Sequence, residues 1–386
     1  MPMHRVVMCL FAGAITAGAA EGAGAQGLPE SWSLQQVARA GQSGLPHRLR
    51  FIKYETPAVN DRGDWAIATD LGLLVNGTLL SGPQYNLPDS SVGLSERGVV
   101  AWAGSVSTGD GGIFTYDIDA GSGGWVTNGP DERFSKRNPT INSDGLIAYG
   151  GASQGFDSVN LHDLASGESR VAVQGNGSTV RIGERVVVND AGQVAYYDAG
   201  GSQRGMQRLE PDGSTTFMYV PGNWSNREWF WMNDNGHVAA LPDQDQIWRT
   251  TDDGPELMVG SFSGPGSQLF RSLELEPPSI NNQGWVSFRA ELEDRSDSLF
   301  LTDGDDFAAV ALEGDLVRTD LGWGRIDSIN AIPTNLNNRG ELLVLADVRL
   351  LGGGHVNDVL FFATVPSPGW TGLALATLLT AERRRR

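Results

Sequence analysis

The stretch INNQGWVSFRA, Ile280 to Ala290, has the pattern of a tight turn that opens a β-strand. An apolar residue precedes Asn281, Gly284 follows three residues later, and bulky and small side chains then alternate. Asn at the first turn position can hydrogen-bond to a backbone amide two residues on. Gly284 can adopt the left-handed conformation that a type I turn followed by a bulge requires. The stretch therefore predicts a turn and a strand with two different faces.

The same pattern occurs seven times along the chain. The first turn residues are Asn60, Ser95, Asn142, Asn189, Asn233, Asn281 and Asn337, and the turn glycines are Gly63, Gly98, Gly145, Gly192, Gly236, Gly284 and Gly340. Successive glycines are separated by 35, 47, 47, 44, 48 and 56 residues. A unit repeated at this period is typical of a solenoid, a propeller or an array. Ser95, which replaces Asn in the second unit, offers a weaker form of the same local bond.

The strand after each glycine is expected to be buried on both faces. Bulky residues lie two and four positions after the glycine, as Val286 and Phe288 do, and this period of two is that of a strand. The position between them holds Ala66, Ala101, Ala148, Ala195, Ala239, Ser287 and Leu343. The mostly small residues there indicate a close neighbour on the second face, and strands buried on both faces indicate stacked sheets.

The rest of each unit supplies further strands. In residues 298–315, SLFLTDGDDFAAVALEGD, an apolar strand, a Gly/Asp turn and a second apolar strand follow one another. Four strands in about 45 residues make a propeller blade. We therefore predict an all-β, seven-bladed β-propeller of four-stranded blades over residues 26–364. An open β array or two β-sandwiches is the alternative, and the short first unit leaves six or eight blades open.

Closure of the ring can be predicted from the two ends of this domain. The last unit supplies only two strands after its turn, in residues 341–348 and 358–365. We expect the other two from SLQQVARAG, residues 33–41, and HRLRFIKYETPAV, residues 47–59. A blade shared by N- and C-terminal strands would leave few exposed strand edges.

Residues 1–25 have the features of a secretory signal peptide. His4 and Arg5 give a weakly basic start, Val6 to Ala20 is apolar and small, and an Ala-x-Ala site ends at Ala25. The single cysteine, Cys9, lies inside this segment. The mature chain is therefore expected to lack disulfides and thiolate metal sites.

The C-terminal segment, residues 365–386, reads VPSPGWTGLALATLLTAERRRR. It consists of a tetrad, about a dozen mostly apolar residues and an arginine cluster; the tetrad is Val365, Pro366, Ser367 and Pro368, and the cluster is Arg383, Arg384, Arg385 and Arg386. Twelve helical residues span about 18 Å, short of the roughly 30 Å hydrocarbon core of a bilayer. An apolar segment followed by arginines can still act as a stop signal, with the arginines on the cytoplasmic side.

This three-part segment resembles the PEP-CTERM sorting signal of exported bacterial proteins, although Ser367 stands where that family usually has Glu. The resemblance implies processing by an exosortase-like enzyme, transient membrane association through the C-terminal helix, and release or attachment at the cell surface. The turns resemble the tandem NxxGxxAF repeats of exported bacterial proteins, over residues 57 to 364. That resemblance implies export and a propeller-like shape.

The charge of the chain excludes some classes of partner. The formal net charge is −18, and it becomes −21 once the two end segments, with five Arg and two Glu, are removed. Lys53 and Lys136 are the only lysines. Nucleic acid is therefore not expected as a partner, because its affinity for proteins comes mainly from cationic contacts with phosphate. Acidity also favours solubility and repels anionic surfaces.

The sequence contains no specific metal motif. The histidines of the mature chain, His47, His162, His237 and His355, lack metal-ligand spacing and are interpreted as solvated loop residues. Acidic clusters occur at Asp243–Gln246, Thr251–Gly254 and Asp303–Asp306. Calcium prefers such oxygen ligands, but none of these clusters matches the twelve-residue calcium loop, and Asp beside Gly is typical of hairpin turns. We predict plain turns and no cofactor, with calcium as the open alternative.

The segment NWSNREWFWMND, residues 223–234, gathers four aromatic side chains. Trp229, Phe230 and Trp231 are expected on a doubly buried strand. Trp224, in the loop after Gly222, is the candidate carbohydrate contact, because an exposed tryptophan can stack on a sugar ring.

No catalytic motif is present. Neither a G-x-S-x-G elbow nor a phosphate-binding glycine loop occurs, so no catalytic residue is assigned. We predict an exported, surface- or matrix-associated, non-catalytic propeller that binds or organises extracellular polysaccharide or a surface protein. The alternative is an extracellular glycan-active hydrolase or lyase, with paired carboxylates gathered at the central channel.

Overall fold

The computed structural model of the protein describes residues 28–47, 49–51, 57–81, 88–105, 111–126, 137–153, 156–176, 182–200, 204–222, 229–243, 245–274, 276–330 and 336–365. All regular structure in these ranges is β-strand. Within them, no element is a helix with the length and apolarity needed to cross a bilayer. The signal peptide and residues 366–386 of the sorting segment lie outside the described ranges.

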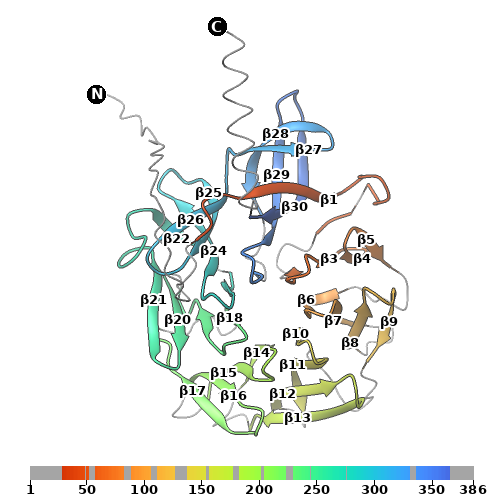
Figure 1. Cartoon of the computed structure of the whole chain (residues 1–386), viewed down its shortest axis with the longest axis vertical. Coiled ribbons are helices and arrows are strands. Elements are labelled where there is room, and N and C mark those ends of the chain that lie inside the picture. Colours follow the sequence, from red (N-terminus) through yellow and green to blue (C-terminus); the bar gives the residue numbers. More distant parts are fainter. Residues whose placement is uncertain are drawn as a thin grey trace, which may run out of the picture.

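Seven antiparallel sheets are arranged in a ring around a central opening, as Figure 1 shows. This arrangement confirms the predicted seven-bladed propeller. The strands of each blade, from the centre outward, follow one another along the chain, except in the blade that closes the ring. Each Asn-x-x-Gly turn connects the innermost strand of a blade to the second strand.

Blades 1 to 4 follow the four-stranded plan. Blade 1 consists of β2 (Ala58–Val59), β3 (Trp65–Thr69), β4 (Gly72–Val75) and β5 (Thr78–Leu80). Blade 2 consists of β6 (Pro88–Leu94), β7 (Val99–Ser105), β8 (Gly111–Asp117) and β9 (Ser122–Trp125). Blade 3 consists of β10 (Arg137–Ile141), β11 (Leu146–Ser153), β12 (Phe156–Asp163) and β13 (Glu168–Gln174). Blade 4 consists of β14 (Ile182–Val188), β15 (Val194–Asp198), β16 (Gly205–Leu209) and β17 (Thr215–Met218).

Blades 5 to 7 include two additions to that plan. Blade 5 consists of β18 (Phe230–Met232), β19 (Val238–Ala240), β20 (Gln246–Thr251) and β21 (Gly254–Gly260). The inner strand of blade 6 is split into β22 (Phe270–Leu273) and β23 (Ser279–Ile280), followed by β24 (Val286–Leu292), β25 (Asp297–Thr302) and β26 (Phe307–Leu312). Blade 7 consists of β28 (Gly322–Ile329), β29 (Leu342–Leu350), β30 (His355–Thr364) and β1 (Ser33–Arg39), with β27 (Leu316–Thr319) paired to the free edge of β28.

Blade 7 confirms closure by both chain ends but corrects its details. β1 pairs with β30 as the outermost strand, with Ser33 opposite Thr364. The second predicted contribution, residues 47–59, instead forms the inner strand of blade 1 through β2, and Phe51 bridges Thr69 there. Blade 7 takes only one N-terminal strand, because its inner strand is β28, which precedes the blade 7 turn in the sequence and pairs with β29.

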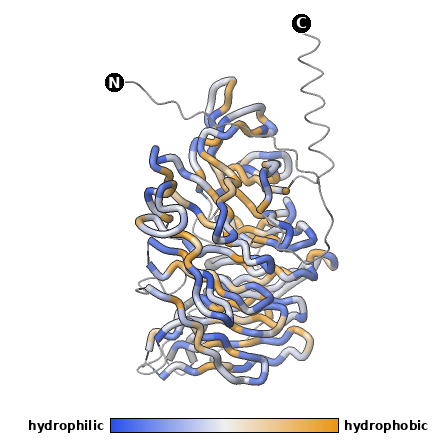
Figure 2. The backbone as a smooth tube through the Cα atoms, turned by 60° about the vertical axis from the view of Figure 1, so that its left-hand side comes forward, coloured by the Kyte–Doolittle hydropathy of each residue, from blue (hydrophilic) through white to orange (hydrophobic). Residues whose placement is uncertain are grey.

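The core lies between neighbouring blades. All seven residues at the small position of the repeat are fully buried, as expected for strands with a sheet on each side. Around the opening motif, Phe288 packs with Phe270 and Met258 toward blade 5, whereas Trp285 packs toward blade 7. Figure 2 shows hydrophobic and hydrophilic segments interleaved through the stacked blades. Burial of apolar surface between sheets is therefore repeated around the ring.

Candidate functional site: the central channel

The seven turns have the predicted local geometry. Their glycines have φ between 75° and 86°, in the left-handed region. The side-chain oxygen of Asn281 accepts hydrogen bonds from the amides of Gln283 (3.2 Å) and Trp285 (3.0 Å). The amide four residues after the first turn position donates to that side chain in every repeat, including Ser95, whose hydroxyl accepts from Val99 at 3.1 Å.

The turns also bond to one another around the channel. The side-chain amide of each turn Asn donates to the backbone carbonyl of the first turn residue in the next blade. The pairs are Asn60–Ser95 (3.0 Å), Asn142–Asn189 (3.1 Å), Asn189–Asn233 (3.0 Å), Asn233–Asn281 (2.7 Å), Asn281–Asn337 (3.3 Å) and Asn337–Asn60 (3.0 Å). We call this set the asparagine ring.

A second ring is formed by the residue that follows each first turn residue. Its backbone amide donates to the side chain at the same position in the next blade. The pairs are Asp61–Glu96 (2.8 Å), Ser143–Asp190 (2.7 Å), Asp190–Asp234 (2.9 Å), Asp234–Asn282 (2.9 Å), Asn282–Asn338 (2.8 Å) and Asn338–Asp61 (2.6 Å). We call this set the amide–acid ring.

Both rings are open at the same junction, between blades 2 and 3. Ser95 has no side-chain amide to donate to Asn142. At the next position, no hydrogen bond joins the Glu96 amide to Ser143 within the described residues, and the hydroxyl of Ser143 is directed toward Asp190, to which it donates at 2.7 Å. Each ring therefore has six of its seven possible bonds. The missing bond of one ring lies at the same junction as the missing bond of the other.

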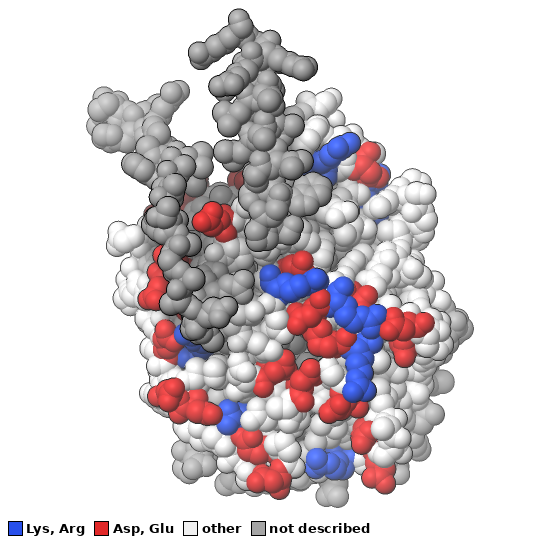
Figure 3. Space-filling view, viewed as in Figure 1, with Lys and Arg blue, Asp and Glu red and all other residues white. Residues whose placement is uncertain are grey.

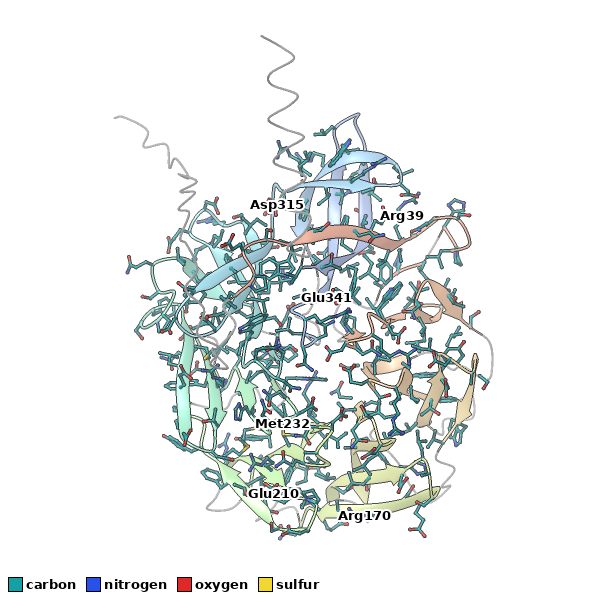
Figure 4. All side chains as sticks on the ribbon, in the orientation of Figure 1. Arg39, Arg170, Glu210, Met232, Asp315 and Glu341 are labelled. Carbon is teal, nitrogen blue, oxygen red and sulfur yellow. The ribbon has the colours of Figure 1, made fainter. Side chains whose placement is uncertain are left out.

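The two rings line a cavity of about 100 Å³ in the channel. Met232, Trp231 and Thr140 contribute to its wall below the turns. Figure 4 shows Met232 and Glu341 on the inner side of the ring, whereas Arg170 lies at its outer edge. A water molecule needs about 10–15 Å³ of such space, while pockets for drug-sized ligands measure about 300–1,000 Å³. The cavity suits several water molecules and is too small for a sugar chain.

The mouth of the channel at the turns is acidic. Asp61, Glu96, Asp190 and Asp234 come from four different blades, and Figure 3 shows acidic side chains around the central opening, with basic side chains beside them. Burial and the negative charges of Asp61, Asp190 and Asp234 raise the pKa of Glu96 to about 7, although the hydrogen bond from the Asp61 amide acts in the opposite direction. In a fraction of the molecules, the Glu96 carboxyl is therefore protonated near neutral pH.

These carboxylates are held by structural hydrogen bonds. Asp190 accepts bonds from the amide and hydroxyl of Ser143, and Asp61 accepts bonds from the amide and side chain of Asn338. No group of three or more His, Cys, Asp or Glu arranged to hold a metal ion occurs among the described residues. The arrangement holds neighbouring blades in register, and its chemistry is hydrogen bonding between turns.

One cationic side chain lies deeper in the ring. The guanidinium of Arg185, on β14, lies 5.6 Å from the ring centroid of Trp231, on β18. Arg185 is buried, and Trp231 contributes to the cavity wall. Trp231 is only half-buried, and so is Trp229, which precedes β18. The predicted doubly buried strand therefore holds for Phe230 but not for the two tryptophans.

The site residues predicted from the sequence fall into three groups. The turn residues come together around the channel, as described. Val365 follows β30 directly and is half-buried, whereas the remaining sorting-signal residues lie outside the described ranges. Trp224 also lies outside them, so its contact with carbohydrate stays a prediction.

The histidine interpretation is wrong for one residue. His162 is buried in β12 and its Nδ1 lies 2.8 Å from the Ser169 hydroxyl; burial lowers its pKa. His47 is exposed in a turn, as expected. His355 is exposed but begins β30, and His237 lies in its turn but is half-buried. The acidic clusters are turns in which Asp side chains accept nearby amides, as Asp303 does from Asp305 and Asp306.

Sequence reasoning missed the residues that follow the first turn positions. Four of the seven are acidic, namely Asp61, Glu96, Asp190 and Asp234. An alignment of the seven repeats to one another would have shown this acidic column. No sequence pattern indicated the position of Arg185 beside Trp231, because the two residues belong to different repeats.

The fold is shared with a solved structure of low sequence identity. A streptogramin B lyase has 10% identity and a TM-score of 0.53, with 87% of this chain and 98% of that chain covered. Oligogalacturonate lyase from Vibrio parahaemolyticus has 13% identity and a TM-score of 0.49, with 87% and 98% covered. TolB from Acinetobacter baumannii has 14% identity and a TM-score of 0.43, with 65% of this chain covered but only 61% of TolB. The likeness to the streptogramin B lyase concerns the propeller fold alone.

The family can be assigned from the sequence directly. No curated protein matches the chain. The match to a family, in contrast, extends over residues 9–364 and so includes all seven blades. The chain belongs to DUF7453, a family of unknown function.

Proposed function

We propose that this protein is an exported, non-catalytic propeller held at the cell surface, where it binds extracellular polysaccharide or a surface protein. The observation that carries the proposal is that both ends of the propeller leave it at the same face. β1 begins where β30 ends, since Ser33 pairs with Thr364. Both points lie at the blade 7 turn: Trp32 Nε1 donates to the Gly340 carbonyl at 2.9 Å, and a Cβ built on Gly340 would lie 3.4 Å from Val365 Cγ2.

This geometry supports one orientation at a membrane. The sorting signal predicted for residues 365–386 would extend from the face that carries the seven turns, which we call the turn face. The opposite ends of the strands, such as the hairpin between β29 and β30, would then point away from the membrane. Binding is therefore assigned to the opposite face and the blade edges.

The channel supports a binding role over the glycan-active alternative. The carboxylates at its mouth are held by amides of neighbouring blades, and the cavity of about 100 Å³ would not admit a sugar chain. A glycosidase needs one carboxylate free to protonate the leaving group and a second to act as nucleophile or base.

Single-cysteine labelling tests export and orientation together, because Cys9 in the predicted signal is the only native cysteine. Gly352→Cys places a thiol on the β29–β30 hairpin, and Asp144→Cys places one on the turn face. Both positions are exposed. On intact cells, a membrane-impermeant maleimide should label Gly352→Cys readily and Asp144→Cys only after detergent. Labelling of neither variant before lysis would contradict export to the surface.

The sorting segment needs its own control. Deletion of Arg383 to Arg386 should change the processing or the location of the Gly352→Cys protein, as judged by fractionation. Equal labelling of the two cysteine variants on intact cells would contradict the membrane-held orientation, and unchanged processing after the deletion would remove the role of the arginines.

A further inference from the structure

Blade 7 carries an addition that the other blades lack. The interval between Gly284 and Gly340, 56 residues, is the longest in the series, and it contains β27 and β28. β27 pairs with the free edge of β28, with Leu316 opposite Arg325 and Arg318 opposite Trp323. Figure 1 shows this hairpin projecting from the ring.

The hairpin has one buried and one exposed face. Val317, Thr319, Gly324 and Ile326 point inward and are buried, and the residues between them are exposed. The exposed face continues onto β29, since Arg325 pairs with Arg349 and the Leu351 amide bonds to the Trp323 carbonyl at 2.9 Å. We call this surface the Arg–Trp face; it consists of Leu316, Arg318, Trp323, Arg325, Arg349 and Leu351.

Large apolar side chains on this face are open to solvent. Trp323 is 51% exposed, Leu316 53% and Leu351 62%. Leu316 and Trp323 belong to the β27–β28 hairpin and Leu351 to the adjoining β29–β30 turn. Contiguous apolar surface on a soluble protein is often an interaction site, so this cluster is a stronger candidate for one than scattered exposed leucines would be.

The same face is cationic on an acidic protein. Within the described residues, neither Arg318 nor Arg325 forms an ion pair, although Arg325 Nη1 donates to the Gly314 carbonyl at 2.6 Å. Arg349 is paired with Asp327, which also lies 3.0 Å from His355 Nε2. Beside this face, a groove of about 450 Å³ between blades 6 and 7 is lined by Arg295 together with Arg325 and Arg349, and by Asp294, Glu313 and Asp327.

The hairpin is held in place by the closing strand. Arg39 on β1 forms two hydrogen bonds of 2.6 Å with the carboxylate of Asp320, in the β27–β28 turn, and Gln36 bonds to the same residue at 3.1 Å. Figure 4 shows Arg39 on β1 beside this hairpin. A fixed surface loses little conformational entropy when it binds a ligand.

We propose that the Arg–Trp face binds an anionic, carboxylate-bearing polysaccharide. The planar guanidinium groups of Arg318 and Arg325 can each bind a carboxylate through two parallel hydrogen bonds. The Trp323 ring offers an apolar surface on which a sugar ring can stack. Adjacent strands are about 4.8 Å apart, so the face spans several strands in a row and suits an extended chain more than a compact ligand.

Charge complementarity and position select this ligand class. Anionic partners are repelled by most of this protein, whose formal charge is −18, so they would concentrate at the one described surface where unpaired arginines surround a tryptophan. The hairpin lies at the end of β29 opposite the turn face, so this inference rests on the proposed surface role and names its ligand.

The test measures binding of the whole protein to alginate, a linear polyuronate, and to its propylene glycol ester, in which most of the carboxylates are masked. The double variant Arg318→Gln/Arg325→Gln and the variant Trp323→Ala should each weaken alginate binding by about tenfold or more. The matched controls are Arg170→Gln, an exposed arginine on β13, and Phe262→Ala, an exposed aromatic residue; both should bind as the unaltered protein does. Thermal melting of each variant checks that it is folded.

Several results would overturn this inference. Equal binding of alginate and its ester would show that carboxylates are not recognised, and binding of polyglutamate as tight as that of alginate would show that sugar is not. A loss in the arginine variant without a loss in Trp323→Ala would indicate a nonspecific polyanion surface. Absence of alginate binding would overturn the ligand while surface labelling of Gly352→Cys stood, so the two proposals fail separately.

Discussion

Two junctions between blades differ in how their turns are bonded. Between blades 7 and 1, Asn337 donates to the Asn60 carbonyl at 3.0 Å, and Asn338 donates to Asp61 from both its backbone amide (2.6 Å) and its side chain (2.8 Å). Every bond of the two rings is present at this junction, where the blade is assembled from both ends of the domain.

Between blades 2 and 3, neither ring bond is present. An exposed ion pair between Arg97 and Asp144 at 3.4 Å remains there, together with a buried bond of 3.3 Å from the Ser91 amide to the Asn138 side chain. Exposed ion pairs contribute little to stability. The comparison shows that the closing junction, where the polypeptide does not run directly from one blade to the next, has the same two ring bonds as the other five complete junctions, whereas the junction between blades 2 and 3 lacks both.

The largest expected effect is at the closing junction. Asn337→Ala removes the bond to Asn60 and leaves the buried backbone amide of Glu341 and the partly buried amide of Arg339 without their side-chain acceptor. We expect the free energy of unfolding to fall by about 2–3 kcal/mol, because buried polar groups left unpaired cost about 1–3 kcal/mol. Chemical denaturation measures the change.

Ser95→Ala is the matched control at the open junction. It removes only the local bond from the Val99 amide, so the expected loss is about 1 kcal/mol or less. Equal losses in the two variants would mean that the asparagine ring adds nothing across the closing junction.

A smaller, opposite effect is expected from completing the rings. Ser95→Asn would supply the missing donor to the Asn142 carbonyl, and Ser143→Asn would supply an acceptor for the Glu96 amide. The double variant should be more stable by about 1 kcal/mol, since a net hydrogen bond contributes about 0.5–1.5 kcal/mol and Ser143 gives up its bond to Asp190. A melting temperature at or below that of the unaltered protein would contradict a simple missing-bond explanation.

The smallest expected effect depends on pH at Glu96, whose side chain accepts the Asp61 amide at the junction between blades 1 and 2. The pKa of Glu96 is about 7 in the folded protein, against an ordinary value of 4.5, so the folded state binds this proton more tightly than the unfolded chain. Its contribution to stability is full below pH 4.5 and is lost as the pH rises through 7. Glu96→Gln keeps an acceptor for the Asp61 amide and removes the charge.

The Gln variant should therefore be more stable than the unaltered protein at pH 8, by an amount on the order of 1 kcal/mol once solvent screening is allowed for, and equally stable at pH 4. Denaturation midpoints at the two pH values give the comparison. A stability gap of the same size at both would assign the effect to packing instead of charge.

The repeat unit could be predicted from the sequence because its signals are local. Left-handed glycines such as Gly284, the Asn281 side chain and the alternation around Ser287 depend on neighbours within ten residues, and the sevenfold recurrence predicted the number of blades. The bonds that close the rings could not be predicted, because the side-chain amide of Asn281 reaches a carbonyl 56 residues away.

The closing blade was predicted in part for the same reason. The Ser33–Arg39 strand was correctly expected in the closing blade. Residues 47–59 were wrongly expected there, since nothing local distinguishes the inner strand of one blade from the outer strand of another. The β27–β28 hairpin was not predicted, although the interval of 56 residues between turn glycines indicates an insertion there. This hairpin carries Trp323, the aromatic residue on which binding of the proposed ligand depends.

The central claim is that hydrogen bonds between the turns hold neighbouring blades together. Native-state hydrogen exchange tests this claim most directly. The amides of Asn338 and Glu96 occupy equivalent positions in two turns, but only Asn338 has an acceptor in the next blade, the Asp61 carboxylate at 2.6 Å. We predict that the Asn338 amide exchanges slowly, through large-scale opening of the ring, whereas the Glu96 amide exchanges near its intrinsic chemical rate. Equal protection at the two positions would contradict the account.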